Sequence, residues 1–576
     1  MDSKGPVYTL NNECQDCYKC VRRCPVKAIR IQDGHACVLP DRCIACGRCV
    51  APCPSHAKRV RSDTERVRQA LSSGKRIYVS LAPSWRASFS CDSRQMVATL
   101  LKTGFAGVSE TAWGAQEVSI ETARQLNAMD KGLMISTACP VIVNYVRRYR
   151  PDMIPYLAPL GSPALTHAKM LKQTYGDDCT VVFIGPCVAK KAEADEHPEL
   201  LYAALTFEEL KVWWKENDIH VVADTDADGA FVPERACEGG LYPLDGGMNE
   251  TIRRVGVKES VQLVPVCSFD LFADALKTVQ PDALKQPLFI EALACDGGCV
   301  HGPCVAAAAS DMNNMSRILR HVRNRDRVPN QARVVVDQAY TPKPVGQRSY
   351  SLEELRAALR RIGKYLPEDE LNCAGCGYQT CKDMARALLD GDAEPAMCVS
   401  YMRKIATRKV AALLKSMPSA MVMVDKNLNI LETNEAFIKM FAGNMRDIFL
   451  SDPQKMTGLP LKGLFNGGKL FATVLATGQE MHREGHKYNG KMYDVHLFPI
   501  EAAESVGAII TDMTNTQHDR EGVARKARDV INKNIATVQQ IACLLGEHIV
   551  ETESILNTIA NEYDSADGET TGGEQG

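Results

Sequence analysis

Cysteine is the residue whose number and spacing point most directly to chemistry in this sequence. The chain of 576 residues holds 23 cysteines, and two dense runs of the form C-x2-C-x2-C-x3-C-P open it. The first run is Cys14, Cys17, Cys20 and Cys24, and the second is Cys43, Cys46, Cys49 and Cys53. A large chain in a reducing cytosol does not use cysteines as a disulfide framework, so thiolates that bind metal are the leading explanation.

The spacing of the two runs resembles that of bacterial ferredoxins, in which three thiolates hold one 4Fe-4S cluster and the fourth crosses to the other cluster. The resemblance implies one cluster held by Cys14, Cys17, Cys20 and Cys53, and a second held by Cys43, Cys46, Cys49 and Cys24. Structural zinc sites also use C-x2-C pairs. Because both runs end in the Cys-Pro pair of ferredoxins, we favour iron-sulfur clusters over zinc and expect the two clusters to transfer electrons.

A third compact cysteine group lies far downstream and has the pattern C-x2-C-G-x3-C followed by one more cysteine. Its members are Cys373, Cys376, Cys381 and Cys398. The pattern resembles a small 4Fe-4S module of corrinoid iron-sulfur proteins. Zinc is a stronger alternative here, since four thiolates with one C-x2-C pair suit it as well. The presence of other clusters in the chain favours a third 4Fe-4S cluster.

Four more cysteines stand in short, separate contexts: Cys139 before Pro140, Cys187 after Gly185-Pro, and Cys295 with Cys299 in C-D-G-G-C. Residues far apart in the sequence converge when each follows a strand of an α/β lobe, where loops carry the chemistry. The three segments resemble the three signature motifs of FeFe hydrogenases, and the resemblance spans roughly residues 1–340. The remaining seven cysteines, Cys37, Cys91, Cys179, Cys237, Cys267, Cys304 and Cys543, are expected to be packing residues.

The resemblance implies that these four cysteines hold the 4Fe-4S part of an H-cluster. Cys299 would also bridge to its diiron subsite, which carries CO, cyanide and an azadithiolate. Lys190 aligns with the family lysine that donates a charge-assisted hydrogen bond to one cyanide. Pro83 and Ser84, after the strand expected at 76–81, match the segment that lines the second cyanide. The alternative for Lys190 is a solvated lysine beside its neighbour Lys191.

The departures from the family pattern concern proton transfer and the contacts around the diiron site. Catalytic members carry T-S-C-C-P, in which the first cysteine passes protons to the diiron site, whereas this chain has Ala138, which cannot relay a proton. Two family methionines are replaced by Gly185 and Leu293. A relay built on water, on Glu121 (a weak local match) or on His301 would be slower or gated, because proton transfer requires groups within hydrogen-bond reach. We therefore expect a functional H-cluster with low turnover.

The segment after the third cysteine group changes character and resembles a PAS domain, the common α/β sensor module. It reads as helix, alternating strand, turn, strand and helix, followed by strands expected at 480–488, 491–499 and 506–513. Asn489-Gly490 is a strong two-residue hairpin signal. The ligand of this domain is unknown from the sequence. Residues 516–563 show apolar positions three and four apart, which suits a dimeric or partner-binding helix.

The domains expected from these patterns form a multidomain chain. They are a ferredoxin-like α+β domain at 1–65, a two-lobed α/β FeFe-hydrogenase domain at 72–340, a small 4Fe-4S domain at 352–405, a PAS α/β domain at 408–515, the helical segment at 516–563 and a disordered tail at 564–576. About 60 residues follow the PAS segment, too few for a kinase catalytic domain. Any output is therefore expected to act on a separate kinase or phosphatase.

Charge and hydropathy exclude other classes. The chain has 68 Lys and Arg against 70 Asp and Glu, a balance that argues against nucleic-acid binding. It lacks a signal-peptide core and any apolar run of about 18 residues, so we expect a cytoplasmic protein without a membrane partner. The expected partners are H2 and protons, a ferredoxin-like electron carrier, the maturation machinery for the diiron subsite and, in a homodimer, a second copy of the chain.

The function expected from this resemblance is reversible oxidation of H2 to protons and electrons, with low turnover, by an oxidoreductase that senses H2 through its PAS domain. The order of the domains suggests that the third cluster stands between the active site and the sensor. One alternative is a ferredoxin-linked metabolic hydrogenase with fast turnover. The other is a non-catalytic iron-sulfur protein that keeps the four cysteines without the diiron subsite, against which Lys190 argues.

Overall fold

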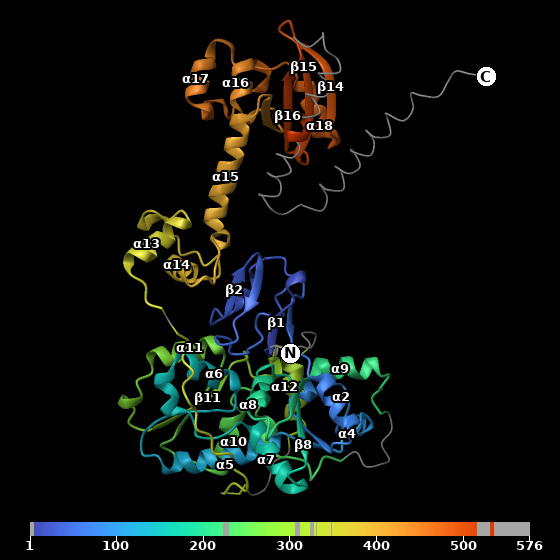
Figure 1. Cartoon of the computed structure of the whole chain (residues 1–576), viewed down its shortest axis with the longest axis vertical. Coiled ribbons are helices and arrows are strands. Elements are labelled where there is room, and N and C mark those ends of the chain that lie inside the picture. The colour runs from blue at the N-terminus through green and yellow to red at the C-terminus, as the bar shows by residue number, and fades with distance from the viewer. Residues whose placement is uncertain are drawn as a thin grey trace, which may run out of the picture. The chain divides into compact units, whose positions relative to one another are not determined.

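The computed structural model describes residues 5–222, 230–305, 311–322, 328–329, 331–346, 348–514 and 530–534 (Figure 1). The chain divides into two compact units, Met1–Met397 and Cys398–Gly576. Of the helical segment expected at 516–563, only 530–534 are described, and both Cys543 and the tail expected at 564–576 lie outside the described residues. Within the described residues, every helix is too short or too polar to cross a lipid bilayer.

Residues 5–60 form two small antiparallel sheets around the cysteine runs. Strand β1 (Val7–Thr9) pairs with β4 (Lys58–Val60), and β2 (Ile29–Gln32) pairs with β3 (His35–Val38). The short helix α1 (Lys19–Arg23) carries Cys20 and leads into Cys24. Because β1 and β4 come from the two ends of this region, their pairing closes it into one body.

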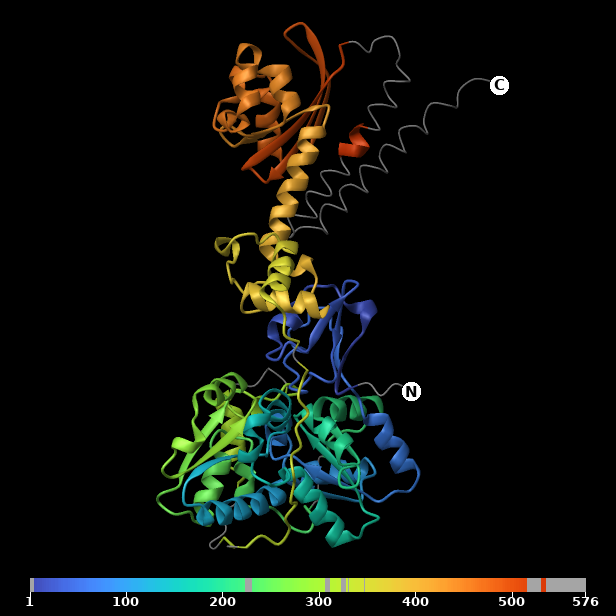
Figure 2. The same ribbon diagram turned by 60° about the vertical axis from the view of Figure 1, so that its left-hand side comes forward.

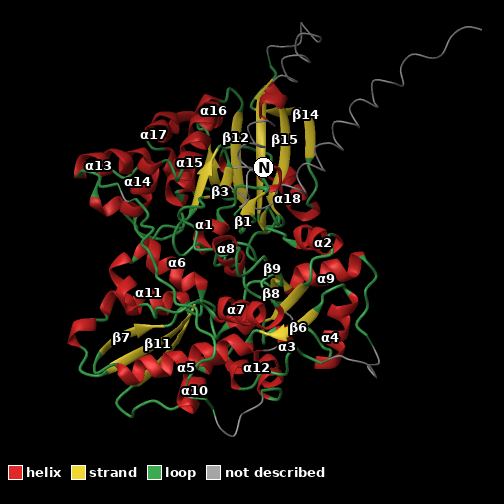
Figure 3. Cartoon of the chain, turned by 60° about the horizontal axis from the view of Figure 1, so that its bottom comes forward, coloured by secondary structure: helices red, strands yellow, loops and turns green. Residues whose placement is uncertain are grey.

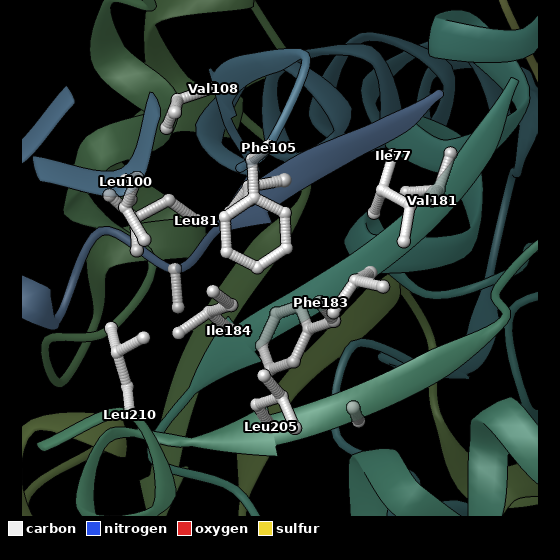
Figure 4. Close-up of a cluster of buried hydrophobic side chains, with 14 of the residues drawn as sticks. Ile77, Leu81, Leu100, Phe105, Val108, Val181, Phe183, Ile184, Leu205 and Leu210 are labelled. Atoms are coloured by element: carbon white, nitrogen blue, oxygen red, sulfur yellow. The ribbon is translucent and has the colours of Figure 1, made fainter. Parts of the chain in front are cut away.

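A four-stranded parallel sheet of order β6-β5-β8-β9 forms the first of two α/β lobes, which Figure 2 shows below the cysteine-rich region. Its strands are β5 (Ile77–Leu81), β6 (Gly107–Glu110), β8 (Thr180–Gly185) and β9 (Ala203–Thr206). The strands are almost entirely buried, as expected for a parallel sheet covered on both faces. Figure 4 shows their apolar side chains meeting Leu100 of α4 (Ser93–Lys102) and Leu210 of α9 (Phe207–Glu216).

The second lobe contains a three-stranded parallel sheet of order β10-β11-β7. Its strands are β7 (Gly132–Ile135), β10 (Gln262–Cys267) and β11 (Pro287–Leu293). The helices around it include α5 (Ala112–Ala128), α6 (Pro140–Tyr149), α10 (Gly247–Val255) and α11 (Phe269–Thr278), as Figure 3 shows. Helix α5 packs on α7 (Pro163–Tyr175) at Gly114, where a Cβ atom would lie 2.0 Å from the Pro163 carbonyl oxygen. Only glycine allows this approach.

A small helical region ends the first unit. Helices α13 (Leu352–Arg361) and α14 (Cys381–Asp390) each begin with a capping box, Ser351 with Glu354 and Thr380 with Asp383. Helix α14 ends at Gly391, whose positive φ of 74° provides the left-handed C-cap. The turn at Gly391 brings the next residue, Asp392, back toward the N-terminal region.

The second unit consists of the long helix α15 (Val399–Ser416) and a five-stranded antiparallel sheet of order β13-β12-β16-β15-β14. The strands are β12 (Ala420–Asp425), β13 (Ile430–Thr433), β14 (Met481–Tyr488), β15 (Lys491–Glu501) and β16 (Ser505–Asp512). Helices α16 (Glu435–Phe441) and α18 (Gly468–Thr477) pack into the same core as these strands. Asn489 and Gly490 both have positive φ, as a two-residue hairpin turn requires.

Candidate metal centre

The four separately placed cysteines leave the carboxyl ends of strands in both lobes. Cys139 follows β7 and caps the N-terminus of α6, Cys187 follows β8, and Cys295 and Cys299 follow β11. Burial, and then the neighbouring Cys139 thiol, raise the pKa of Cys187 to about 11. Burial raises the pKa of Cys299 as well, followed by the effects of Cys139 and Cys187. The structure thus brings the four thiols within electrostatic range of one another.

Buried thiols that raise each other's pKa are unfavourable as bare thiolates. Metal binds the deprotonated form and supplies the positive charge that this arrangement lacks. The donor set therefore fits an iron-sulfur group of the kind expected for Cys139, Cys187, Cys295 and Cys299.

Lys190 lies beside these thiols in a buried position on α8 (Ala189–Glu196). Its Nζ donates to Ser162 Oγ at 2.8 Å and to Glu193 Oε2 at 2.6 Å. Its positive charge acts on both Cys187 and Cys299. An ammonium group has three donors, and these two bonds leave one for a ligand.

The neighbouring Lys191 is also buried, with 0% of its side chain exposed. Its Nζ donates to the Glu209 carboxylate at 2.8 Å, to the Ala204 carbonyl oxygen at 2.7 Å and to Asp63 Oδ2 at 3.4 Å. The adjacent lysines therefore face different partners, since Lys190 lies at the cysteine site and Lys191 holds α8 against β9 and α9.

Ser84 supplies a polar group that fits a ligand near the end of β5. Pro83 leads out of β5, and Ser84 caps α3 (Trp85–Ser88) with 1% of its surface exposed. Within the described part of the chain, its Oγ is buried and has no hydrogen-bond partner. A buried hydroxyl without a partner is costly, so this position suits an acceptor that comes with the cofactor.

The three family departures have structural counterparts. Ala138 is half-buried and packs against an apolar cluster in the second lobe. At Gly185, a Cβ atom would lie 2.5 Å from the Phe183 ring and 2.8 Å from Ala82 Cβ, so the ring takes the space that a methionine needs. Leu293 is buried at the end of β11. The sequence does not reveal that Phe183 fills this space, because the side-chain direction of a strand residue cannot be predicted from the sequence.

Glu121 lies on α5 in a tight ion pair. Its carboxylate accepts bonds from Arg124 Nε at 2.8 Å and Nη2 at 2.5 Å, and from Gln125 Nε2 at 2.9 Å. The Arg124 hydrogen bonds hold the pKa of Glu121 below its usual range. A carboxylate held in this way carries no proton near neutral pH, so its role as a relay requires the pair with Arg124 to open.

Glu291 is a buried carboxyl that the sequence reasoning missed. It lies on β11 with 1% of its surface exposed and accepts the backbone N–H groups of Met248 at 3.1 Å and Asn249 at 2.8 Å. Burial raises the pKa of Glu291 to about 7 despite these bonds, and its charge acts on Cys299. A group that exchanges a proton near neutral pH at this place suits general acid-base transfer. The only sequence signal is a charged residue inside an otherwise apolar strand.

The N-terminal cysteines gather in two groups. Burial, and then Cys46, Cys24 and Cys43, raise the pKa of Cys49. The structure thus places Cys24 of the first run with the second run. Cys46 in turn acts on Cys295, so this group neighbours the thiol site of the two lobes.

The first three cysteines of the first run lie near one another. The thiols of Cys14 and Cys17 act on Cys20, as does the ammonium of Lys58. Cys53 accepts the backbone N–H of Lys58. The position of Cys24 agrees with the crossed arrangement expected from the sequence, whereas the assignment of Cys53 to the first cluster stays a prediction, since Lys58 also acts on Cys43 and Cys49.

The first C-x2-C loop of each of the three cysteine groups shares a backbone feature. The residue after the second cysteine is left-handed in each: Tyr18 with φ 56°, Gly47 with φ 74° and Gly377 with φ 95°. Left-handed residues within such loops turn backbone N–H groups inward as nests, which bind iron-sulfur clusters. Among the residues that the structure describes, no group of His, Cys, Asp and Glu is set to hold a single metal ion.

The third cysteine group is divided between the two units. Cys373 is exposed, Cys376 and Cys381 are half-buried, and all three lie in the first unit. The Cys381 backbone N–H donates to Asn372 Oδ1 at 2.8 Å, which stabilises this loop at the start of α14. Cys398 belongs to the second unit and caps the N-terminus of α15.

Comparisons with known proteins assign three segments. Residues 75–303 match the iron only hydrogenase large subunit, C-terminal domain, residues 6–54 match the 4Fe-4S dicluster domain, and residues 369–400 match a putative Fe-S cluster family. Iron hydrogenase 1 of Clostridium pasteurianum is 27% identical in a match that covers 42% of this chain and 52% of that protein. The chain thus spans about half the length of this curated relative.

Two solved structures illustrate the structural matches. FeFe hydrogenase HydA1 from Chlamydomonas reinhardtii matches with 18% identity and a TM-score of 0.37, over 48% of this chain and 99% of that chain. The PAS domain of histidine kinase ThkA matches with 19% identity and a TM-score of 0.13, over 16% of this chain and 98% of that chain.

Proposed function

We propose that this chain, an FeFe-hydrogenase-like iron-sulfur protein, reversibly oxidises H2 to protons and electrons with low turnover and uses the reaction to sense H2. The observation that supports this most is that four thiols lie within electrostatic range of one another after strands of both lobes, with Lys190 beside them. Ser84, whose hydroxyl has no partner within the described residues, follows β5 of the first lobe. Cys139, Cys187, Cys295 and Cys299 would hold an H-cluster. When bound, that cofactor would supply the site at which H2 is split.

The chain's own groups would then orient ligands and move protons. Lys190 keeps one N–H donor beside the thiols after bonding to Ser162 and Glu193, and Ser84 offers its unpartnered hydroxyl. Glu291, whose pKa is raised to about 7 by burial, is better placed than the ion-paired Glu121 to take up and release protons. Ala138, by contrast, offers no proton donor, which supports the low turnover that we propose.

The sensing role rests on the second unit. Its five-stranded antiparallel sheet with helices supports a PAS-like domain, and Cys398, a ligand proposed for the third cluster, caps the helix that leads into this sheet. The partners that we propose are a ferredoxin-like electron carrier and a kinase or phosphatase in the cytoplasm, with the chain acting as a homodimer after maturation of the diiron subsite. Deletion of residues 400–576 should abolish H2-dependent signalling, and signalling that survives it would refute this role.

Infrared spectroscopy of the maturated protein tests the proposal directly. We expect stretching bands of CO and cyanide, and we expect the Lys190→Met variant to shift a cyanide band because it removes the donor. Iron-loaded protein without such bands would contradict the proposal and favour the non-catalytic iron-sulfur protein. Bands accompanied by turnover as fast as that of ordinary catalytic hydrogenases would favour the metabolic alternative.

A further inference from the structure

The small helical region that ends the first unit is bound to the N-terminal cysteine region through one buried carboxylate. Asp392 accepts a hydrogen bond from Arg30 Nε at 2.9 Å and another from Arg42, and only 3% of its side chain is exposed. Its backbone carbonyl oxygen accepts the N–H of Ile31 at 3.0 Å. Asp392 therefore links to β2 through both its side chain and its backbone.

A second contact lies at the loop that carries Cys376. Arg22 Nη1 donates to the Gly375 carbonyl oxygen at 3.4 Å. At Gly377, a Cβ atom would lie 3.2 Å from both the Arg22 backbone N and Val21 Cγ1. The loop thus rests on α1 so closely that a side chain at Gly377 would press on the helix, and the positive φ of Gly377 also favours glycine.

Two residues lie within electrostatic range of both Cys24 and the loop cysteine Cys376. Lys27 donates to the Val21 carbonyl oxygen at 3.2 Å, and its ammonium acts on the thiols of both Cys24 and Cys376. Tyr378 is buried and lies within electrostatic range of the same two cysteines. Cys24 and Cys376 therefore share a cation and a buried aromatic residue.

We propose that Asp392, together with Arg30 and Arg42, is a positioning residue that fixes the third cysteine loop against α1 beside Cys24. Because Lys27 and Tyr378 act with both Cys24 and Cys376, we place the third group next to the group of Cys24, Cys43, Cys46 and Cys49. Arg22, which also donates to the Cys17 carbonyl oxygen at 2.9 Å, links the loop to the first run as well, and the spectroscopic test below separates the two neighbours. This inference rests on the cluster assignments of the proposed function. The Cys24 group is then a branch point for electron transfer. When its cluster is oxidised by one electron, that electron reduces either the third cluster or the cluster of the other N-terminal group.

The docking depends on the negative charge of Asp392. One buried carboxylate lies between two guanidinium groups, so its removal leaves two cations facing each other without compensation. The contact also carries a backbone hydrogen bond to β2, whose protection from solvent exchange can be measured. Both effects depend on docking and neither requires H2.

The test compares Asp392→Asn with Asp390→Asn in the iron-loaded full chain. Asp390 lies two residues away on α14 and accepts a hydrogen bond from Tyr350, so it is a matched control in the same region. We expect Asp392→Asn to raise amide hydrogen exchange in residues 29–32 at least about fivefold, while Asp390→Asn leaves it unchanged. Unchanged exchange in Asp392→Asn, with the iron content of the wild type, would overturn the proposal.

The double variant Arg30→Gln, Arg42→Gln removes the same contact from the other side and covers the case in which Asp392→Asn does not fold. It should raise exchange in residues 373–381 while its iron content stays at the wild-type value. Exchange that remains at the wild-type rate in this variant would also overturn the docking.

The neighbour of the third group is tested by electron paramagnetic resonance of protein reduced with dithionite, without H2. We expect a magnetic interaction between the third cluster and its neighbour that Cys46→Ser changes, that Cys17→Ser leaves intact and that Asp392→Asn weakens. The reverse pattern would overturn the proposed branch point. Iron too low for the clusters would instead contradict the proposed function, so the two failures are distinguishable.

Discussion

Ala138 occupies the position at which proton transfer is expected to be weakest. The residue is half-buried and packs against apolar neighbours, and its side chain carries no ionisable group. A thiol adds little volume there and provides a proton carrier, and such carriers contribute about 100- to 10,000-fold to rates. We predict that Ala138→Cys raises H2 production with a reduced viologen at least about tenfold.

The matched control is Ala138→Val, which increases the volume without adding a proton carrier and should not raise the rate. Equal rates in Ala138→Cys and the wild type, at equal H-cluster loading measured by infrared spectroscopy, would show that proton transfer at this position does not limit turnover.

Glu291 gives a prediction with a defined sign. Its pKa is raised from 4.5 to about 7 by burial, so the folded state binds its proton more tightly than the unfolded state. The stability that this provides is present below pH 4.5 and is lost as the pH rises through 7, a loss of about 3 kcal/mol. Glu291→Gln should remove this dependence in urea unfolding between pH 4.5 and 8 and lower turnover about 100-fold.

Glu250→Gln is the control for Glu291, because the Glu250 side chain is 44% exposed and pairs with Arg254 on α10. It should change neither the pH dependence of stability nor the turnover. A Glu291→Gln variant with wild-type turnover would assign proton transfer to another group.

Single residues differ in how far the sequence predicts them. The cysteines could be grouped in advance because cluster binding imposes their spacing, and the structure places Cys24 with Cys43, Cys46 and Cys49. The buried position of Lys191 could not be predicted, because its charge is compensated by Asp63, which lies 128 positions away in the chain. A buried charge depends on tertiary partners, which spacing alone does not reveal.

At the scale of elements, Lys191 connects three of them. Its ammonium bonds to the β9 carbonyl of Ala204 and to Glu209, which is also the capping-box residue of α9. Removal of one partner from a buried ion pair leaves an uncompensated charge and costs about 3–5 kcal/mol. We predict that Lys191→Gln lowers the free energy of unfolding of the first unit by this amount, measured by urea unfolding.

Lys211→Gln provides the comparison for Lys191. Lys211 lies on the same helix α9 as Glu209 and forms an exposed pair with Glu208, a type of pair that contributes at most about 1 kcal/mol. Equal losses in the two variants would mean that the buried network contributes no more than a surface pair.

The elements themselves were predicted to different degrees. The strands expected at 480–488, 491–499 and 506–513 differ from the observed strands by at most two residues at either end, because an Asn-Gly turn and alternating polarity define them locally. The order β6-β5-β8-β9 was not predicted, since crossover connections between parallel strands leave no local signal of which strands become neighbours.

At the scale of the whole molecule, chain order was an incomplete guide. It suggested a third cluster between the active site and the sensor, whereas the first unit brings the loop of Cys376 against α1, more than 350 residues earlier in the chain. The contact depends on Asp392 and two arginines of the N-terminal region. Isolated charges of this kind are common in any sequence, so their pairing is visible only in the fold.

Cys398, the fourth cysteine of the third group, is the first residue of the second unit. Cys398 caps α15, and α15 runs without interruption to Ser416, shortly before β12 of the antiparallel sheet. A helix N-terminus favours negative charge, so a change in the charge of a group held by Cys398 acts on the first turn of α15. We predict that reduction by H2 changes amide hydrogen exchange in residues 399–425, and that Cys398→Ser abolishes this change while viologen reduction by H2 continues. A response to H2 that persists in Cys398→Ser would require another route to the second unit, since the helix would then transmit nothing from this cysteine.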